Sequence, residues 1–291
     1  MKIINFGSLN IDHVYRVERF GQPGETLPSK QYRRGPGGKG LNQSVALAHA
    51  GMSVVHAGAI GEDGEWLLEF LQDRKVDTSL VYRSEDATGH AVIQVADSGE
   101  NSILLHAGAN QTIPDTHIAH ALEPFGSGDV ILLQNEINNL PLIMETAAEK
   151  EMYIVFNPAP FTPLVADYPL ENVNLFIINE IEGQQLTGED VPMSMMDALH
   201  ARYPKVEIVL TLGANGAMYR GGDDMFKVSA EKAQVRDTTA AGDTFTGFYL
   251  AERLRGKSSL IALSMASKAA ALCVTRSGAA SSIPHASEVP G

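Results

Sequence analysis

Short apolar runs rich in Val, Ile and Leu alternate with segments of helical period along the chain, and this alternation constrains the fold most strongly. Strands that read as continuous apolar runs are typical of parallel sheets, because helices cover both faces of such sheets. The pattern therefore predicts an α/β fold with a mostly parallel sheet. Buried strands are expected at residues 3–6, 54–57, 130–133, 153–156, 175–178 and 208–212. Helices are expected at residues 41–50, 64–74, 141–150, 244–255 and 258–275.

Two stretches depart from this rhythm and have the character of antiparallel β ribbons. Residues 13–34 lack a helical period and contain several Gly and Pro, and residues 90–106 alternate apolar and polar around a turn. We expect both to pair into a small β lid on a single domain that spans residues 1–291. The apolar face of such a lid needs a cover, so a homodimer that forms through the lid is expected.

Charge and cysteine content exclude several classes of function. Lys and Arg number 22 against 35 Asp and Glu, a formal net charge of -13, whereas nucleic-acid binding needs clustered cations. No segment has the ~20 apolar residues of a membrane span, and the chain starts without the apolar run of a signal peptide. The single cysteine, Cys273, excludes an intramolecular disulfide, and the nine histidines lack zinc-site spacing. The expectation is a cytoplasmic protein without nucleic-acid or membrane partners.

The sharpest chemical signal is residues 237–245, Asp-Thr-Thr-Ala-Ala-Gly-Asp-Thr-Phe, which lead into an expected helix. Small side chains there let successive N–H groups approach a phosphoryl group, and the start of a helix favours negative charge. We expect the amides of Ala241, Gly242 and Asp243 to form an anion hole. Asp243 is placed to accept a proton from an attacking hydroxyl. The alternative interpretation is an Asp that caps a helix after a turn of small residues.

A glycine-rich segment, residues 35–43, also runs into an expected helix. It is not a Walker A loop, because Arg33 occupies the position of the first required glycine. Gly38 and the neighbouring glycines let the backbone approach a ligand, Lys39 can bind hydroxyls or anionic oxygens, and Asn42 offers a donor and an acceptor. An ordinary glycine turn with a solvated lysine is the alternative.

Asn10 and Asp12 follow the first expected strand. Ligands of open α/β sheets bind at the carboxyl ends of strands, so both side chains have a suitable position. A carboxylate beside an amide suits the vicinal hydroxyls of a sugar. The alternative is an Asx turn that closes the strand.

These three segments, in this order and spacing, together resemble the ribokinase/phosphofructokinase-B family of carbohydrate kinases. Similar blocks occur at residues 106–110, 157–160, 179–182, 211–216 and 274–279, so the resemblance covers nearly the whole chain. It implies a Rossmann-like domain and transfer of the γ-phosphoryl group of MgATP to the primary hydroxyl of a pentose, first of all O5 of D-ribose. A kinase for another furanose or a nucleoside, or a sugar sensor without catalytic activity, remains an alternative.

The resemblance also implies roles for individual residues. Asp243 would be the catalytic base, beside Gly242 and Ala241. Sugar contacts are implied at Asn10, Asp12, Gly38, Lys39, Asn42 and Glu136. ATP contacts are implied at Asn179, Thr211, Gly213, Gly216, Gly242 and Ser267. A potassium ion is implied near Asp237, Thr239, Cys273, Arg276, Gly278 and Ser282. Glu182 would position Mg²⁺ through water. Ser267 stands where the family usually places a His or an Asn near adenine, so the base preference stays open.

Overall fold

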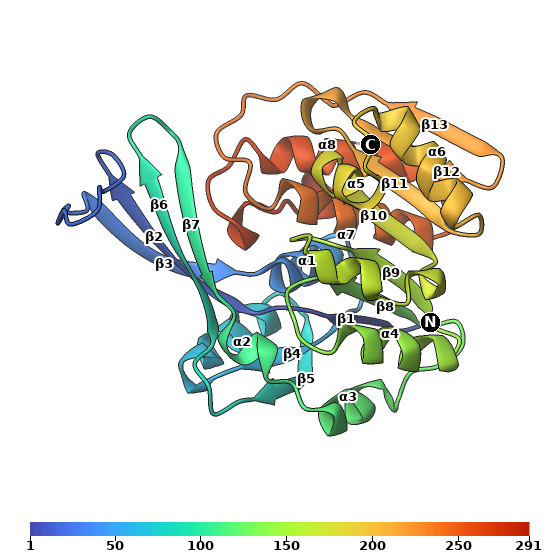
Figure 1. The fold of residues 1–291 in the computed structure, drawn as a ribbon, viewed down its shortest axis with the longest axis horizontal. Helices are drawn as coiled ribbons and strands as arrows, with labels where there is room; N and C mark the ends of the chain where they lie inside the picture. The colour runs from blue at the N-terminus through green and yellow to red at the C-terminus, as the bar shows by residue number, and fades with distance from the viewer. Residues whose placement is uncertain (291) are drawn as a thin grey trace.

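The computed structural model describes residues 1–290 and contains two sheets (Figure 1). The larger sheet has nine strands in the order β13-β12-β11-β10-β9-β8-β1-β4-β5. The strands from β5 to β11 in this order are parallel, and β12 and β13 continue the sheet as antiparallel strands. Their bounds are β1 Ile3–Phe6, β4 Val55–Ile60, β5 Asp77–Arg83, β8 Val130–Gln134, β9 Tyr153–Asn157, β10 Leu175–Asn179, β11 Glu207–Thr211, β12 Ala217–Gly221 and β13 Asp224–Val228. The predicted α/β fold with a mostly parallel sheet is confirmed.

Helices cover both faces of the larger sheet, as the apolar strands require. Ile3 and Ile4 of β1 enter two different core clusters, because neighbouring side chains of a strand point to opposite faces. Apolar residues of α1, α2, α7 and α8 join the first cluster, and those of α3, α4 and α6 join the second. The helices are α1 Lys39–His49, α2 Glu65–Gln72, α3 Asp115–Leu122, α4 Leu140–Glu149, α5 Glu180–Thr187, α6 Pro192–Arg202, α7 Ala241–Leu254 and α8 Ser259–Cys273.

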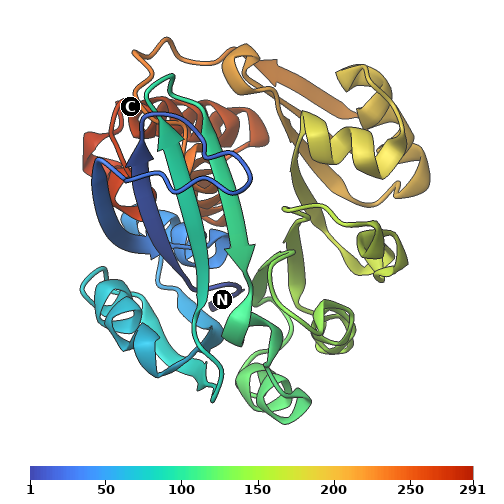
Figure 2. The ribbon, with the colours of Figure 1, turned by 60° about the vertical axis from the view of Figure 1, so that its left-hand side comes forward.

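The smaller sheet is the lid, and it projects from one side of the body (Figures 1 and 2). Its order is β3-β2-β6-β7, with bounds β2 Asn10–Val17, β3 Gln31–Gly37, β6 Gly89–Ala96 and β7 Asn101–His106. The hairpins β2–β3 and β6–β7 are antiparallel as expected, but the pair β2–β6 that joins them is parallel. Because both strands leave the larger sheet at the same edge, they run in the same direction. The lid strands begin at Asn10 and Gly89, slightly before the expected bounds.

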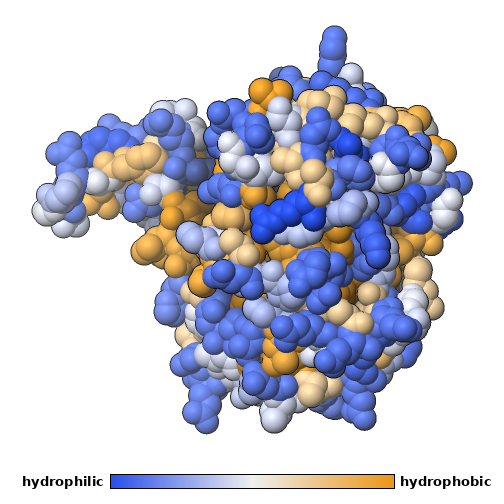
Figure 3. Space-filling model, turned by 45° about the vertical axis from the view of Figure 1, so that its right-hand side comes forward, coloured by the Kyte–Doolittle hydropathy of each residue, from blue (hydrophilic) through white to orange (hydrophobic). Residues whose placement is uncertain are grey.

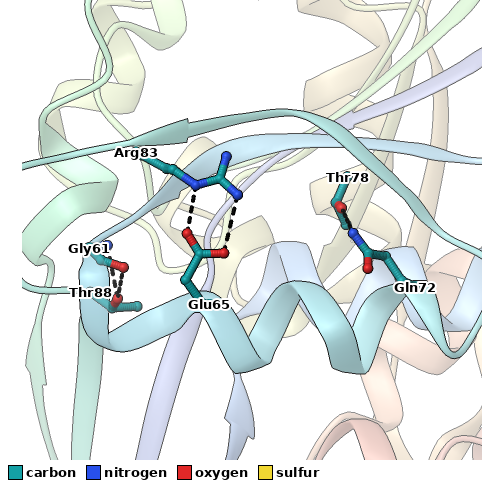
Figure 4. A network of polar contacts seen from close by, with 6 residues as sticks. All are labelled: Gly61, Glu65, Gln72, Thr78, Arg83 and Thr88. Carbon is teal, nitrogen blue, oxygen red and sulfur yellow. Dashed lines mark hydrogen bonds and ion pairs between the residues drawn. The ribbon is translucent and has the colours of Figure 1, made fainter.

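Polar contacts fix α2 against β5, and others fix the base of the lid against the body (Figure 4). Glu65 of α2 forms an ion pair with Arg83 of β5 at 2.6 Å. Thr88, directly before β6, accepts a hydrogen bond from the Gly61 N–H at 2.9 Å. The guanidinium of Arg34, on β3, lies 4.7 Å from the ring centre of Trp66 in α2. The lid therefore contacts the body beyond its own connecting strands.

Several elements were missed by the sequence analysis. These are β5, β12, β13, α3, α5 and α6. Only some residues of β5 and none of β13 are buried, so neither strand has the continuous apolar run that identified the central strands. The start of α7 was wrong by three residues, because the helix begins at Ala241 and already contains Asp243 in its first turn. Within residues 1–290, no helix has both the length and the apolar content needed to cross a membrane.

Candidate active site

A cavity of about 230 Å³ lies at the carboxyl ends of β9, β10 and β11. The segment that leads into α7 forms its other wall, as expected for an open α/β sheet, whose ligands bind at this edge. Its lining residues are Lys39, Asn157, Ala159, Ile177, Ile178, Asn179, Glu182, Thr211, Thr238, Ala240, Ala241, Gly242, Asp243 and Thr246. The cavity therefore joins the glycine-rich segment, through Lys39, to the segment of residues 237–243.

Asp243 lines this cavity, with only 7% of its surface exposed. Asn42 Nδ2 donates to its Oδ2, and Gln43 Nε2 donates to its Oδ1, each at 2.9 Å. Both amides belong to α1, so the two motifs that lie 200 residues apart in the sequence are in direct contact. Two N–H donors, one on each oxygen, therefore fix the orientation of the carboxylate.

The backbone at the start of α7 offers amides to the cavity. Ala240 has a left-handed conformation, with φ of 61°, and directs the chain into the helix. The amides of Gly242 and Asp243 lie in the first turn, where N–H groups have no acceptor within the helix. The N–H of Ala241, however, donates to the carbonyl of Thr238 at 3.2 Å. Of the three amides expected to form an anion hole, that of Ala241 is therefore already paired.

Asn10 and Asp12 lie at the base of the lid, on β2. Asn10 is buried, and its Oδ1 accepts a hydrogen bond from Asn110 Nδ2 at 2.7 Å. A β-carbon at Gly37 would collide with the carboxylate of Asp12, so the neighbouring strand needs glycine there. Burial and then the charge of Glu136 raise the pKa of Asp12 to about 7, although Arg33 lowers it. Asp12 is therefore poised to titrate near neutral pH.

Glu136 supports the glycine-rich segment. Its Oε2 accepts hydrogen bonds from the Ser8 hydroxyl and, at 2.9 Å, from the backbone N–H of Lys39. Burial raises the pKa of Glu136, while the ammonium of Lys39 opposes this rise. Burial also acts against the charge of Lys39, but the carboxylates of Asp243, Glu136 and Glu182 raise its pKa above the ordinary value. Lys39 is therefore a cation enclosed by carboxylates.

Asn179 and Glu182 form a capping box at the start of α5. The Asn179 side chain accepts from the Glu182 N–H at 2.9 Å, and Glu182 Oε2 accepts from the Asn179 N–H at 3.0 Å. Burial raises the pKa of Glu182 despite these hydrogen bonds. In the described part of the chain, no group of three or more His, Cys, Asp or Glu could hold a metal. Mg²⁺ that keeps most of its waters and rests on phosphates needs only one or two carboxylates, so Glu182 at this cavity fits it.

Asp237 organises the loop to which potassium was assigned. Its Oδ1 accepts from the Thr239 N–H at 3.0 Å, and its Oδ2 accepts from the Gly278 N–H at 2.9 Å. Burial acts to raise the pKa of Asp237, but these hydrogen bonds lower it below the ordinary range. Cys273 Sγ lies 3.1 Å from Ser282 Oγ, which brings α8 and the following loop to the same place. These contacts bring together five of the six residues expected to hold a monovalent cation, with the Asp237 carboxylate as the charged oxygen donor among them.

The side chain of Arg276 points away from the other residues expected to hold potassium. Its guanidinium pairs with Glu288 at 2.7 Å, away from Asp237, and its backbone N–H donates to the carbonyl of Cys273 at 3.0 Å. Only the backbone of Arg276 therefore belongs to the loop around Asp237.

The residues assigned to ATP are only partly brought together. Thr211 ends β11 and lines the cavity, where its hydroxyl donates to the carbonyl of Ile178 at 3.2 Å. Gly213 opens a 3-10 turn just beyond β11, and Gly216 follows this turn with φ of 95°. Ser267 is buried in α8 and does not line the cavity.

Comparison with known proteins matches residues 1–286 to the pfkB family carbohydrate kinases. The chain belongs to this family. It is 36% identical to a ribokinase of Haemophilus influenzae over 97% of this chain and 95% of that protein. It is 32% identical to a ribokinase of Staphylococcus aureus over 99% of this chain and 98% of that protein.

Solved structures of the family agree with this assignment. A ribokinase of Arabidopsis thaliana complexed with ribose and ATP superimposes with a TM-score of 0.89 at 29% identity, covering 99% of this chain and 97% of that one. A ribokinase of Cryptococcus neoformans in complex with ADP gives a TM-score of 0.85 at 33% identity, covering 99% and 98%. A Methanocaldococcus jannaschii nucleoside kinase at 18% identity shares the fold, with a TM-score of 0.82 over 99% of this chain and 97% of that one.

Proposed function

We propose that this pfkB-family chain is an ATP-dependent ribokinase that phosphorylates O5 of D-ribose to give D-ribose 5-phosphate. The observation that carries the proposal is the position of Asp243, whose carboxylate is held by two amide donors at the wall of a cavity shared with Lys39. Relatives named as ribokinases support the choice of ribose, since they match nearly the whole chain. ATP is the donor, as in the complex of the Arabidopsis ribokinase with ribose and ATP.

The sugar binds between the lid base and α1 in this proposal. Asn10 and Asp12 receive sugar hydroxyls, and Lys39 and Asn42 bind from the other side. Asn42 Oδ1 supports this assignment, because it is buried and has no hydrogen-bond partner within residues 1–290. A buried acceptor without a partner costs stability, and a sugar hydroxyl would satisfy it. Gly38 lets the backbone approach the sugar. Glu136 holds Lys39 in place by accepting a hydrogen bond from its backbone N–H.

The chemical step starts with Asp243 as general base. Its carboxylate takes the proton of the sugar hydroxyl as O5 forms a bond to the γ-phosphorus and the bond from that phosphorus to the leaving oxygen of ADP breaks. The amides of Gly242 and Asp243 stabilise the negative charge on the transferred group. A single preorganised donor of this kind contributes about a hundredfold or more to kcat. The lid excludes water that would otherwise hydrolyse ATP.

Two ions complete the proposal. Mg²⁺ bound to the ATP phosphates would neutralise their charge, with Glu182 holding it through water. A potassium ion near Asp237 and Thr239, with Cys273, Gly278 and Ser282 beside it, would order the backbone that leads into the anion hole. Asn179, Thr211, Gly213, Gly216 and Ser267 are proposed to contact the nucleotide.

We further propose a cytoplasmic homodimer. The edge strand β7 of the lid exposes Ile103, Leu104 and Leu105, with 71% of Leu104 accessible. Apolar surface is visible on the lid and where it joins the body (Figure 3). An exposed apolar edge strand promotes pairing with another chain, so a second subunit is the proposed cover. The buried free thiol of Cys273 fits the reducing cytoplasm.

The test is release of ADP measured with a panel of pentoses, hexoses and nucleosides. We expect ribose to give the highest kcat/KM, and Asp243→Asn to bind ATP and ribose almost as tightly as the wild type without turnover. Faster turnover of fructose or a nucleoside would replace ribose as the substrate. Ligand binding without any ADP release from the wild type would favour a sugar sensor. Full activity of the Asn variant would remove Asp243 from the role of base.

A further inference from the structure

A chain of buried side-chain amides runs beneath the active site and ends on Asp243. Asn5 of β1, Gln134 of β8 and Gln43 of α1 are each fully buried. Gln134 Nε2 donates to Asn5 Oδ1 at 2.9 Å and to Gln43 Oε1 at 2.7 Å. Gln43 Nε2 then donates to Asp243 Oδ1 at 2.9 Å. Three elements of the fold therefore connect to one carboxylate oxygen.

The backbone sets the direction of this chain. Asn5 Nδ2 donates to the carbonyl of Gly40 at 2.7 Å, and a carbonyl oxygen can only accept. Asn5 must therefore present its amide nitrogen to Gly40 and its oxygen to Gln134. Gln134 in turn must present N–H groups to Asn5 and to Gln43 Oε1, which leaves the amide nitrogen of Gln43 for Asp243.

Reversing one amide would be costly. In a buried site, two oxygens or two N–H groups would face each other across about 3 Å with no water to separate them. The N–H at Asp243 is thus a consequence of the fold and does not depend on which ligand is bound. A donor held in this way fixes the orientation of the carboxylate that accepts it.

We propose that Gln43 is a positioning residue that fixes the orientation of the Asp243 carboxylate for proton transfer. The inference rests on the proposed function, in which Asp243 is the general base. Gln43 is fully enclosed and does not line the cavity, so it acts through Asp243. Asn42 differs, because it is also assigned to the sugar. Variants of Gln43 therefore separate the control of the base from substrate binding.

Gln43 forms hydrogen bonds with several buried residues, so its substitution would lower the stability of the fold even if Gln43 had no role in catalysis. Its Nε2 also donates to Asn157 Oδ1 at 3.1 Å. Loss of thermal stability in a Gln43 variant therefore tests nothing by itself. The decisive measurement is the separation of kcat from KM, since misplacing the base slows proton transfer but leaves the sugar contacts in place.

The experiment compares Gln43→Met with Ser44→Ala in the full-length protein. Ser44 is its fully buried neighbour in α1 and is bonded to Asn5 Nδ2 and His56 Nδ1, each at 2.8 Å. It therefore contacts the chain only at the end farthest from Asp243, where the bond from Asn5 to the Gly40 carbonyl remains. For Gln43→Met we expect kcat to fall by about ten- to a hundredfold, the size of one lost hydrogen bond to a charged group. The KM for ribose should change less than about twofold. Ser44→Ala should keep the wild-type kcat.

A second variant guards against failure to fold. Gln134→Met removes the donor to Gln43 Oε1 without touching Asp243, so a smaller loss of kcat is expected. If the folded variants of Gln43 and Gln134 keep the wild-type kcat, or if Ser44→Ala lowers it equally, the positioning role is refuted. The proposed function fails separately, through a wild type without kinase activity or an active Asp243→Asn variant.

Discussion

Lowering the pH from 8 to 6 should weaken ribose binding through a single group, Asp12. Burial and the neighbouring charge of Glu136 raise the pKa of this carboxyl to about 7. In the proposed function, the ionised form accepts hydrogen bonds from two sugar hydroxyls, whereas the protonated form loses charge-assisted bonds. Because the pKa is raised, the competent form is lost as the pH falls through about 7.

The size of the effect follows from the fraction of Asp12 that is ionised. When only this fraction binds, the apparent Kd equals the intrinsic Kd divided by that fraction. With a pKa of about 7, this gives Kd about twofold above its limit at pH 7 and about tenfold above it at pH 6. At pH 8 the affinity should lie within about 10% of the limit.

Titration calorimetry with ribose alone between pH 5.5 and 8.5 measures this dependence without a contribution from catalysis. Asp12→Asn is the matched control and should bind weakly and without this transition. Arg33→Gln should move the transition to higher pH, because Arg33 lowers the pKa of Asp12. A wild-type affinity that stays constant within twofold over the whole range would refute the reasoning.

Three further predictions concern other parts of the molecule. Asp237→Asn should reduce the activation of kcat by potassium while leaving activity without potassium unchanged, and rates measured in potassium and in sodium salts decide this. Leu104→Glu places a charge on the exposed edge of the lid and should give a monomeric mass by light scattering, whereas Glu100→Gln should leave the mass unchanged. Gly40→Ala should lower the free energy of unfolding by about 3 kcal/mol in denaturant titrations, because its β-carbon would meet the backbone of Gly7 and Ser8. Gly21→Ala, which meets no atom within 4 Å, should change it by less than about 0.5 kcal/mol and is the control.

The central sheet could be predicted because its strands are apolar on both faces. Residues 3–6 and 153–156 were identified from composition alone, and all four residues of β1 are buried. The outer strands β5 and β13 could not be identified in this way, since solvent or a single layer covers part of each strand. The parallel pairing of β2 with β6 could not be predicted from the sequence either, because three strands and two α-helices separate the two strands along the chain.

The candidate active site was also predicted only in part. Asn42 and Asp243 were selected because each lies in a short motif with a chemical purpose. Gln43 was assigned no role, although it directly follows Asn42 in α1. Its importance depends on Gln134, which is 91 positions away and adds no recognisable local pattern. Contacts between distant buried amides become visible only when the fold is known.

Small movements at the proposed sugar site become large movements at the tip of the lid. Asn10 and Asp12 begin β2, the eight-residue strand that continues to the lid tip. A rotation of about 10° at the start of this strand, which is some 26 Å long, would displace its far end by roughly 4.5 Å. A small rotation that closed the lid on a sugar would therefore be magnified along the strand. In a dimer joined through its lids, one subunit would sense mechanically whether its neighbour holds a sugar.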